Sequence, residues 1–104
     1  MKFFEVFISA ENKEQADIIL NSLLAKKLVT GGQFLQAPAR FLWKGKINDM
    51  EEYVTITSFT IENHTAALIE DVKRTAVEEI SMIRFVEFTG NEELRNWIIE
   101  TLKD

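Results

Sequence analysis

The spacing of apolar residues changes several times along this chain and predicts a mixture of strands and helices. Residues 3–9, FFEVFIS, are apolar and aromatic with a single charge, which is typical of a buried strand. Between residues 13 and 29 the apolar positions recur at helical spacing, and Asn12 offers an N-cap for this first helix. The pair Gly31–Gly32 ends the helical pattern, so we expect it to cap the C-terminus rather than to bind an anion.

The middle of the chain predicts a long hairpin. Residues 33–45, QFLQAPARFLWKG, have the composition of one long strand, which Pro38 should bend because proline lacks a backbone donor. Residues 51–60, EEYVTITSFT, are rich in β-branched and aromatic side chains and should pair with it. Gly45 lies between two lysines, where a glycine indicates that the backbone turns. We therefore expect residues 43–47, WKGKI, to form the tip of a hairpin that reaches a neighbouring copy.

The second half of the chain predicts another helix, a strand and a final helix. Thr60 and Asn63 are both suitable caps for the helix that follows the hairpin. Residues 80–88 return to strand composition, and residues 90–91 open a short C-terminal helix. The resulting order, β-α-β-β-α-β plus a helix, is that of the ferredoxin-like α+β sandwich. Two helices should then cover one face of a four-stranded antiparallel sheet.

Length and patterning also predict how the chain is assembled. A chain of 104 residues has room for one core, so we expect a single domain over residues 1–104. The strands at residues 3–9 and 80–88 carry apolar side chains on both faces. Two helices cannot cover both faces, so we expect the second face to be buried against other copies of the chain.

Charge and composition exclude several functional classes. The formal charge of −5 argues against nucleic acid as a partner, because phosphate contacts require a basic surface. No run approaches the roughly 18 apolar residues that span a bilayer, so we expect no membrane insertion. The N-terminus makes a poor signal peptide and the chain has no cysteine, which together favour a cytoplasmic protein.

Few side chains suggest catalysis or metal binding. His64 is the only histidine, so no His-His or His-Cys metal site can form within one chain, and His64 is a weak candidate ligand. The acidic pairs at residues 51–52, 78–79 and 92–93 fit solvated surfaces better than acid–base catalysis. No phosphate-binding loop or nucleophile elbow is present, so we expect no enzymatic activity.

Two stretches resemble a known family. FLWKGKINDMEEYVTITSFT at residues 41–60 and GNEELRNWIIETL at residues 90–102, together with the order of elements, resemble the CutA family of divalent-cation tolerance proteins. The shared features include the turn around Trp43 and Gly45, with Glu52 nine residues after the tryptophan. The resemblance covers essentially the whole chain.

This resemblance implies a homotrimer of ferredoxin-like subunits, similar to the PII signalling proteins and linked to metal tolerance. It places Trp43, Lys46 and Glu52 near a cleft between subunits of a non-enzymatic protein. An alternative is a PII-like sensor in which Lys44 and Lys46 attract an anionic ligand. A third, weaker alternative is an enzyme that uses Lys46 and Glu52 as an acid–base pair.

The chain departs from the family where metal ligands are expected. The family's A-A-C-V-N is replaced by Val29-Thr30-Gly31-Gly32-Gln33, which contains no cysteine. The family's H-P-Y-E-V-P-E-I is replaced by AVEEISMI at residues 76–83, which has neither histidine nor proline. A divalent cation such as copper is the only cofactor that the resemblance suggests. With His64 as the single imidazole, we expect copper to bind weakly.

Overall fold

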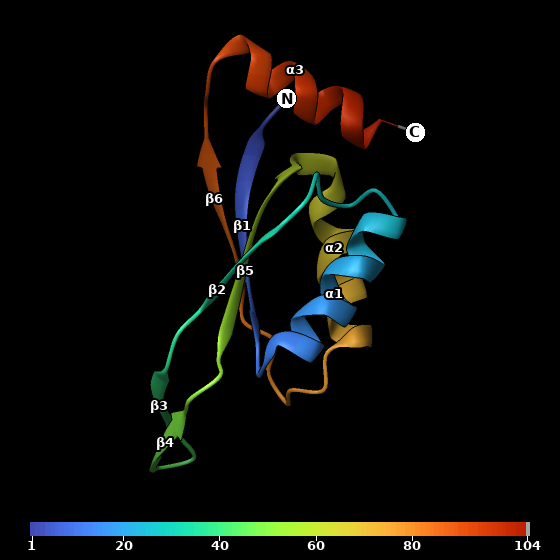
Figure 1. The fold of residues 1–104 in the computed structure, drawn as a ribbon. Helices are drawn as coiled ribbons and strands as arrows, with labels where there is room; N and C mark the ends of the chain where they lie inside the picture. Colours follow the sequence, from blue (N-terminus) through green and yellow to red (C-terminus); the bar gives the residue numbers. More distant parts are fainter. Residues whose placement is uncertain (104) are drawn as a thin grey trace.

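The computed structural model describes residues 1–103 and confirms the ferredoxin-like order (Figure 1). Its main sheet is antiparallel with strand order β2-β5-β1-β6. These strands are β1 (Phe3–Ala10), β2 (Gln33–Gln36), β5 (Val54–Ile61) and β6 (Ile83–Phe88). The helices are α1 (Lys13–Ala25), α2 (Thr65–Thr75), which follows the 3-10 helix η1 (Glu62–His64), and α3 (Glu92–Leu102). Among the described residues, no helix is long and apolar enough to cross a membrane.

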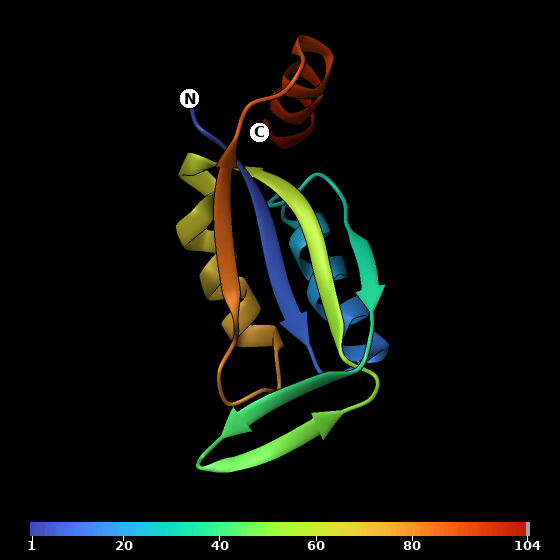
Figure 2. The same cartoon turned by 90° about the vertical axis from the view of Figure 1, so that its left-hand side faces the viewer.

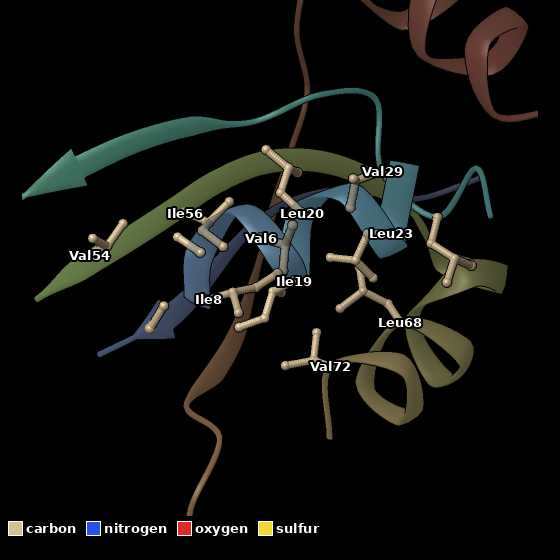
Figure 3. Packing of buried hydrophobic residues seen from close by; sticks show 13 residues of the cluster. Val6, Ile8, Ile19, Leu20, Leu23, Val29, Val54, Ile56, Leu68 and Val72 are labelled. Carbon is tan, nitrogen blue, oxygen red and sulfur yellow. The ribbon is translucent and has the colours of Figure 1, made fainter. Parts of the chain in front are cut away.

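Helices α1 and α2 lie on the same face of the sheet, and the main core fills the space between the two layers (Figures 1 and 3). Alternate residues of β1, including Val6 and Ile8, point into this core and are almost completely buried. Ile19 and Leu23 of α1 lie one helical turn apart and pack against them. Burial of these side chains removes apolar surface from water, which stabilises the fold by about 25 cal/mol for each Å² buried.

The second face of the sheet is covered only at one end. Helix α3 crosses that end of the sheet (Figure 1). Its Ile98 and Leu102 form a smaller core with Phe3 and Ile61, which lie on the second face. Farther along the same face, the Arg84 guanidinium lies 4.3 Å from the centroid of the Phe7 ring. The final helix therefore covers part of the face that we expected other copies to bury.

The predicted hairpin is present, but it leaves the main sheet. Strands β3 (Ala39–Trp43) and β4 (Lys46–Met50) form their own two-stranded ribbon, which crosses the end of the main sheet (Figure 2). The bend expected at Pro38 divides the predicted single strand into β2 and β3. At the tip, Lys44 has φ +51° and Gly45 has φ +79°, which confirms the turn at Gly45.

The N-cap predicted at Asn12 is confirmed, and Asn91 caps α3 in the same way. The Asn12 side chain accepts a hydrogen bond from the backbone N–H of Gln15, and Asn91 accepts one from Leu94. The caps expected for the second helix are wrong. Thr60 lies inside β5 and its hydroxyl donates to the Leu28 carbonyl at 2.8 Å. Asn63 lies within η1, so α2 extends a 3-10 turn and has no side-chain cap.

The predicted C-terminal cap of the first helix is also wrong, because α1 ends four residues early at Ala25. Lys27 has φ +54°, its N–H donates to the Leu24 carbonyl, and the N–H of Leu28 donates to the Leu23 carbonyl. These bonds form a Schellman motif in which a lysine occupies the position that glycine usually takes.

Gly32 has a packing role instead. A Cβ at this position would lie 2.6 Å from Cδ2 of Leu20, inside the main core. The nearby Gly31 carbonyl accepts a hydrogen bond from the Ser58 hydroxyl, which ties this loop to β5. Gly32 therefore lets the chain pass close to α1 and β5, whereas a Cβ at Gly31 would meet no atom within 4 Å.

Candidate functional site

The β3–β4 hairpin lies next to the loop that joins α2 to β6 (Figure 2). Residues of both segments line a cleft of about 500 Å³. Aromatic and methionine side chains form much of its wall, and more of its lining is apolar than polar. Its polar lining includes four carboxylates, from Glu11, Asp49, Glu78 and Glu79, and no lysine or arginine. The cleft is therefore both apolar and acidic.

Local contacts hold the two walls of the cleft in place. On the hairpin side, the ring of Phe41 packs edge-on against Tyr53 with 5.2 Å between centroids. On the loop side, Ser9 of β1 donates its N–H to the Met82 carbonyl and accepts the Met82 N–H on its hydroxyl. The Lys44 ammonium bridges the walls at 3.2 Å from the Glu79 carboxylate.

Tyr53 is the most buried side chain of the cleft, with 7% of its surface exposed. Burial raises the pKa of Tyr53, the nearby Ser9 hydroxyl opposes this rise, and the Glu78 and Glu11 carboxylates add to it. Although Ser9 is near, the Tyr53 hydroxyl has no hydrogen-bond partner among the described residues. An unpartnered buried hydroxyl is unfavourable, and a ligand with a polar group could supply the missing bond.

Glu78 lines the same cleft as Tyr53 and is half-buried. Burial raises the pKa of Glu78, and the negative charge of Glu11 raises it further. Its Oε1 atom has no hydrogen-bond partner among residues 1–103. Neither Glu78 nor Glu11 takes part in an ion pair within the described part of the chain.

The other two carboxylates of the cleft have partners. The Arg40 guanidinium donates to Asp49 at 2.6 Å across the ribbon, and Lys44 neutralises Glu79. The uncompensated negative charge of the cleft therefore belongs to Glu11 and Glu78. A cation placed between them would relieve their mutual repulsion.

The residues proposed from the sequence separate into two groups within one chain. Trp43, at the end of β3, lines the cleft and pairs with Lys46 across the turn. Glu52 lies beyond the other end of β4, where its carbonyl accepts a hydrogen bond from the Gln36 side chain at 3.2 Å. Trp43 and Lys46 are therefore close together, while β4 separates them from Glu52.

His64 lies away from the cleft. It ends η1, just past the C-terminal end of β5, whereas Tyr53 precedes the N-terminal end of that strand. Within residues 1–103, no group of three histidine, cysteine, aspartate or glutamate side chains is arranged to hold a metal ion. This part of the chain therefore provides neither an imidazole site nor a carboxylate cage for a metal.

Sequence reasoning missed two important residues of the cleft and undervalued a third. Glu11 and Tyr53 belong to no sequence motif, and the Glu78–Glu79 pair was interpreted as part of a solvated surface, although all three of Glu11, Tyr53 and Glu78 line the cleft. The only signal was compositional, since Tyr53 is the single tyrosine of the chain. Glu11, Tyr53 and Glu78 come together because β1, β5 and the loop before β6 meet at one end of the sheet.

A protein-family model described as CutA1 divalent ion tolerance protein matches residues 4–101. Among curated proteins, no sequence matches the chain.

Solved structures resemble the chain over nearly its whole length. The periplasmic divalent cation tolerance protein CutA from Archaeoglobus fulgidus is 27% identical, with a TM-score of 0.89 over 97% of this chain and 99% of that one. CutA1 from Pyrococcus horikoshii is 22% identical, with a TM-score of 0.89 over 97% and 99%. CutA1 from Oryza sativa is 19% identical, with a TM-score of 0.91 over 100% and 96%. The latter two likenesses concern the fold alone.

Proposed function

Because the chain belongs to the CutA1 divalent ion tolerance family, we propose that it is a non-enzymatic protein of the cellular response to divalent metal ions. The match of the family model over residues 4–101 carries this proposal. The fold supports it, since the likeness to CutA proteins extends along the whole chain. We further propose that residues 1–104 form a single domain of this type.

The working form is a homotrimer. Leu42 and Ile47, on the hairpin, are 75% and 72% exposed, and Val86, on the partly covered face of the sheet, is 47% exposed. Apolar side chains this exposed on neighbouring elements of a small chain indicate a surface that other copies cover. The hairpin would reach a neighbouring subunit and bury its apolar residues there.

Assembly would also complete the site that the family resemblance implies. Within one chain, Trp43 and Lys46 lie at one end of the β3–β4 ribbon and Glu52 at the other. In a ring of copies, the tip of one hairpin can approach the base of the next. The cleft near Trp43, Lys46 and Glu52 would then lie between subunits.

Copper is expected to bind only weakly. The chain has no cysteine, and His64 stands apart from the carboxylates of the cleft. Carboxylates alone suit hard cations better than copper. Calorimetry should show copper affinity weaker than micromolar, and a tighter site that survives His64→Ala would contradict this expectation.

The alternative of an anion sensor is less well supported. Four carboxylates and no basic side chain line the cleft, so an anion would be repelled there. Lys44 and Lys46 would have to bind the anion outside it, and Lys44 already pairs with Glu79.

Cytoplasmic localisation stays a prediction from composition, and the Archaeoglobus fulgidus relative is a periplasmic protein.

Two measurements test the proposal. Sedimentation equilibrium at micromolar concentration should give the mass of a trimer, also in molar salt, because apolar contacts would hold the subunits together. A stable monomer would contradict the assembly. Cells that lose this protein should tolerate divalent metal ions less well and recover with the wild-type chain, and unchanged tolerance would contradict the role.

A further inference from the structure

We propose that the cleft beneath the hairpin binds a small organic cation, an ammonium group carried on an apolar body. This ligand goes beyond the proposed role in the metal-ion response and requires only the cleft within one chain. The proposal depends on the size of the cleft, its uncompensated charge, its unpartnered buried phenol and an example of the same recognition within the protein.

The size and lining of the cleft fit an organic molecule. A volume of about 500 Å³ lies in the range of pockets for small organic ligands and far exceeds what a bare ion needs. The rings of Phe41 and Tyr53, with the Met50 and Met82 side chains, offer an apolar and polarisable wall. An apolar ligand body would be buried against this wall.

The charge of the cleft selects a cation. Glu11 and Glu78 are close enough to repel one another, and neither has a cationic partner among the described residues. Tyr53 lines the same cleft, is more than nine-tenths buried, and its hydroxyl has no hydrogen-bond partner among residues 1–103. An ammonium group could donate to both the Glu78 carboxylate and the Tyr53 oxygen, which would pair atoms that are now unpaired.

The protein already shows this recognition at the rim of the cleft. The Lys44 ammonium lies 5.6 Å from the centroid of the Trp43 ring and 3.2 Å from the Glu79 carboxylate. This arrangement places an ammonium between an aromatic face and a carboxylate. The lining of the cleft also contains an aromatic side chain and a carboxylate in Tyr53 and Glu78, with no lysine or arginine in that lining.

The arrangement is less suited to a metal ion or an anion. No group of three potential metal ligands exists within residues 1–103, and the unpaired phenol of Tyr53 would be a weak ligand for a hard cation. No basic residue lines the cleft to hold an anion.

The first test is a titration of the full-length protein by calorimetry at constant ionic strength. The probes are 2-phenylethylammonium chloride, the neutral 2-phenylethanol and the anionic 3-phenylpropionate. We expect saturable binding of the ammonium compound and at least roughly tenfold weaker binding of the other two, since they lack the charge-assisted bonds. Equal binding of the alcohol and the ammonium compound would overturn the proposal.

Two conservative variants locate the site. Tyr53→Phe removes a hydroxyl that makes no hydrogen bond to any of residues 1–103, and Glu78→Gln preserves the shape of the side chain, so both variants should fold. Each should weaken binding of the ammonium compound roughly tenfold, whereas Glu87→Gln, at an exposed position on β6, should not change it. Undiminished binding by both cleft variants would overturn the assignment.

The oligomeric mass, measured in the same samples, separates this inference from the proposed function. A trimer that binds no ammonium compound would overturn the inference and leave the family role intact. A monomer that binds the compound would preserve the inference while contradicting the proposed assembly.

Discussion

The ammonium of Lys44 lies 3.2 Å from the carboxylate of Glu79 and joins the hairpin tip to the loop before β6. Both side chains are about two-thirds exposed, so this pair contributes at most about 1 kcal/mol. The backbone that presents Lys44 is more constrained, since φ is positive at both Lys44 and Gly45. The turn therefore decides where the tip lies, and the ion pair adds little.

Replacement of Gly45 by valine should destabilise the chain. A β-branched residue at φ +79° is strained even though a Cβ there meets no atom within 4 Å, so we expect a loss of about 1–2 kcal/mol. Lys46→Ala should change the free energy of unfolding by less than about 0.5 kcal/mol. Urea denaturation of both variants measures this, and equal stability would show that the turn adapts.

Trp43→Ala should weaken the proposed trimer. Truncation of an aromatic side chain at the centre of an interface typically costs about 2 kcal/mol or more. The dissociation constant from sedimentation should rise accordingly. Ile18→Ala is the matched control, because Ile18 is 50% exposed on α1, away from the hairpin. If Trp43→Ala assembles as tightly as this control, the indole is not an interface residue.

Lys27→Gly should stabilise the fold. Lys27 occupies the left-handed position of the Schellman motif with φ +54° and forms no ion pair within the described residues. Glycine has no steric penalty there, so the variant should gain about 0.5–1 kcal/mol in unfolding free energy. Lys26→Gly, which breaks the contact to Asp71 in the same turn, should lose stability. A loss in both variants would contradict this account of the cap.

The free energy of unfolding should decrease at acid pH as Asp71 becomes protonated. The carboxylate is 5% exposed and accepts hydrogen bonds from Lys26, Ser22 and Arg74, which joins α1 to α2. Burial alone would raise the pKa of Asp71, but these three partners outweigh it and hold the pKa below the ordinary value of 3.8.

As pH falls, the unfolded chain therefore takes up the proton of Asp71 first. The stability contributed by the ionised carboxylate is fully present above the ordinary pKa and is lost as pH falls through the lowered one. Asp71→Asn should cost about 2 kcal/mol at pH 7 and progressively less below pH 4. A difference from the wild type that does not depend on pH, measured by denaturation, would exclude this linkage.

Glu78→Gln should stabilise the fold at pH 7, which is the opposite of the effect expected for Asp71→Asn. Burial and the nearby Glu11 raise the pKa of Glu78, so its ionised form is less favourable in the folded chain than in the unfolded one. The variant should melt higher than the wild type at pH 7, and the difference should vanish well below the ordinary pKa of 4.5. A lower melting temperature at pH 7 would show that Glu78 is stabilised by a partner in the assembly.

The features predicted correctly from the sequence are those that depend on neighbouring residues. Asn12 caps α1 through a residue three positions away, and the turn at the hairpin tip depends on the backbone angles of two adjacent residues, Lys44 and Gly45. The predicted N-cap at Thr60 is wrong because its hydroxyl has a partner that is distant in the sequence. Its hydroxyl bonds to Leu28, which lies in the loop after α1, and no local pattern reveals that partner.

The sequence by itself determined the order of strands and helices, the family and the glycine turn, because periodicity and backbone preference act over a few residues. Only the tertiary structure decided that the hairpin leaves the sheet and that Glu11, Tyr53 and Glu78 share one cleft. These three side chains are distant in sequence and belong to different elements. They meet because packing of the core places the ends of those elements together, and that packing is a property of the whole chain.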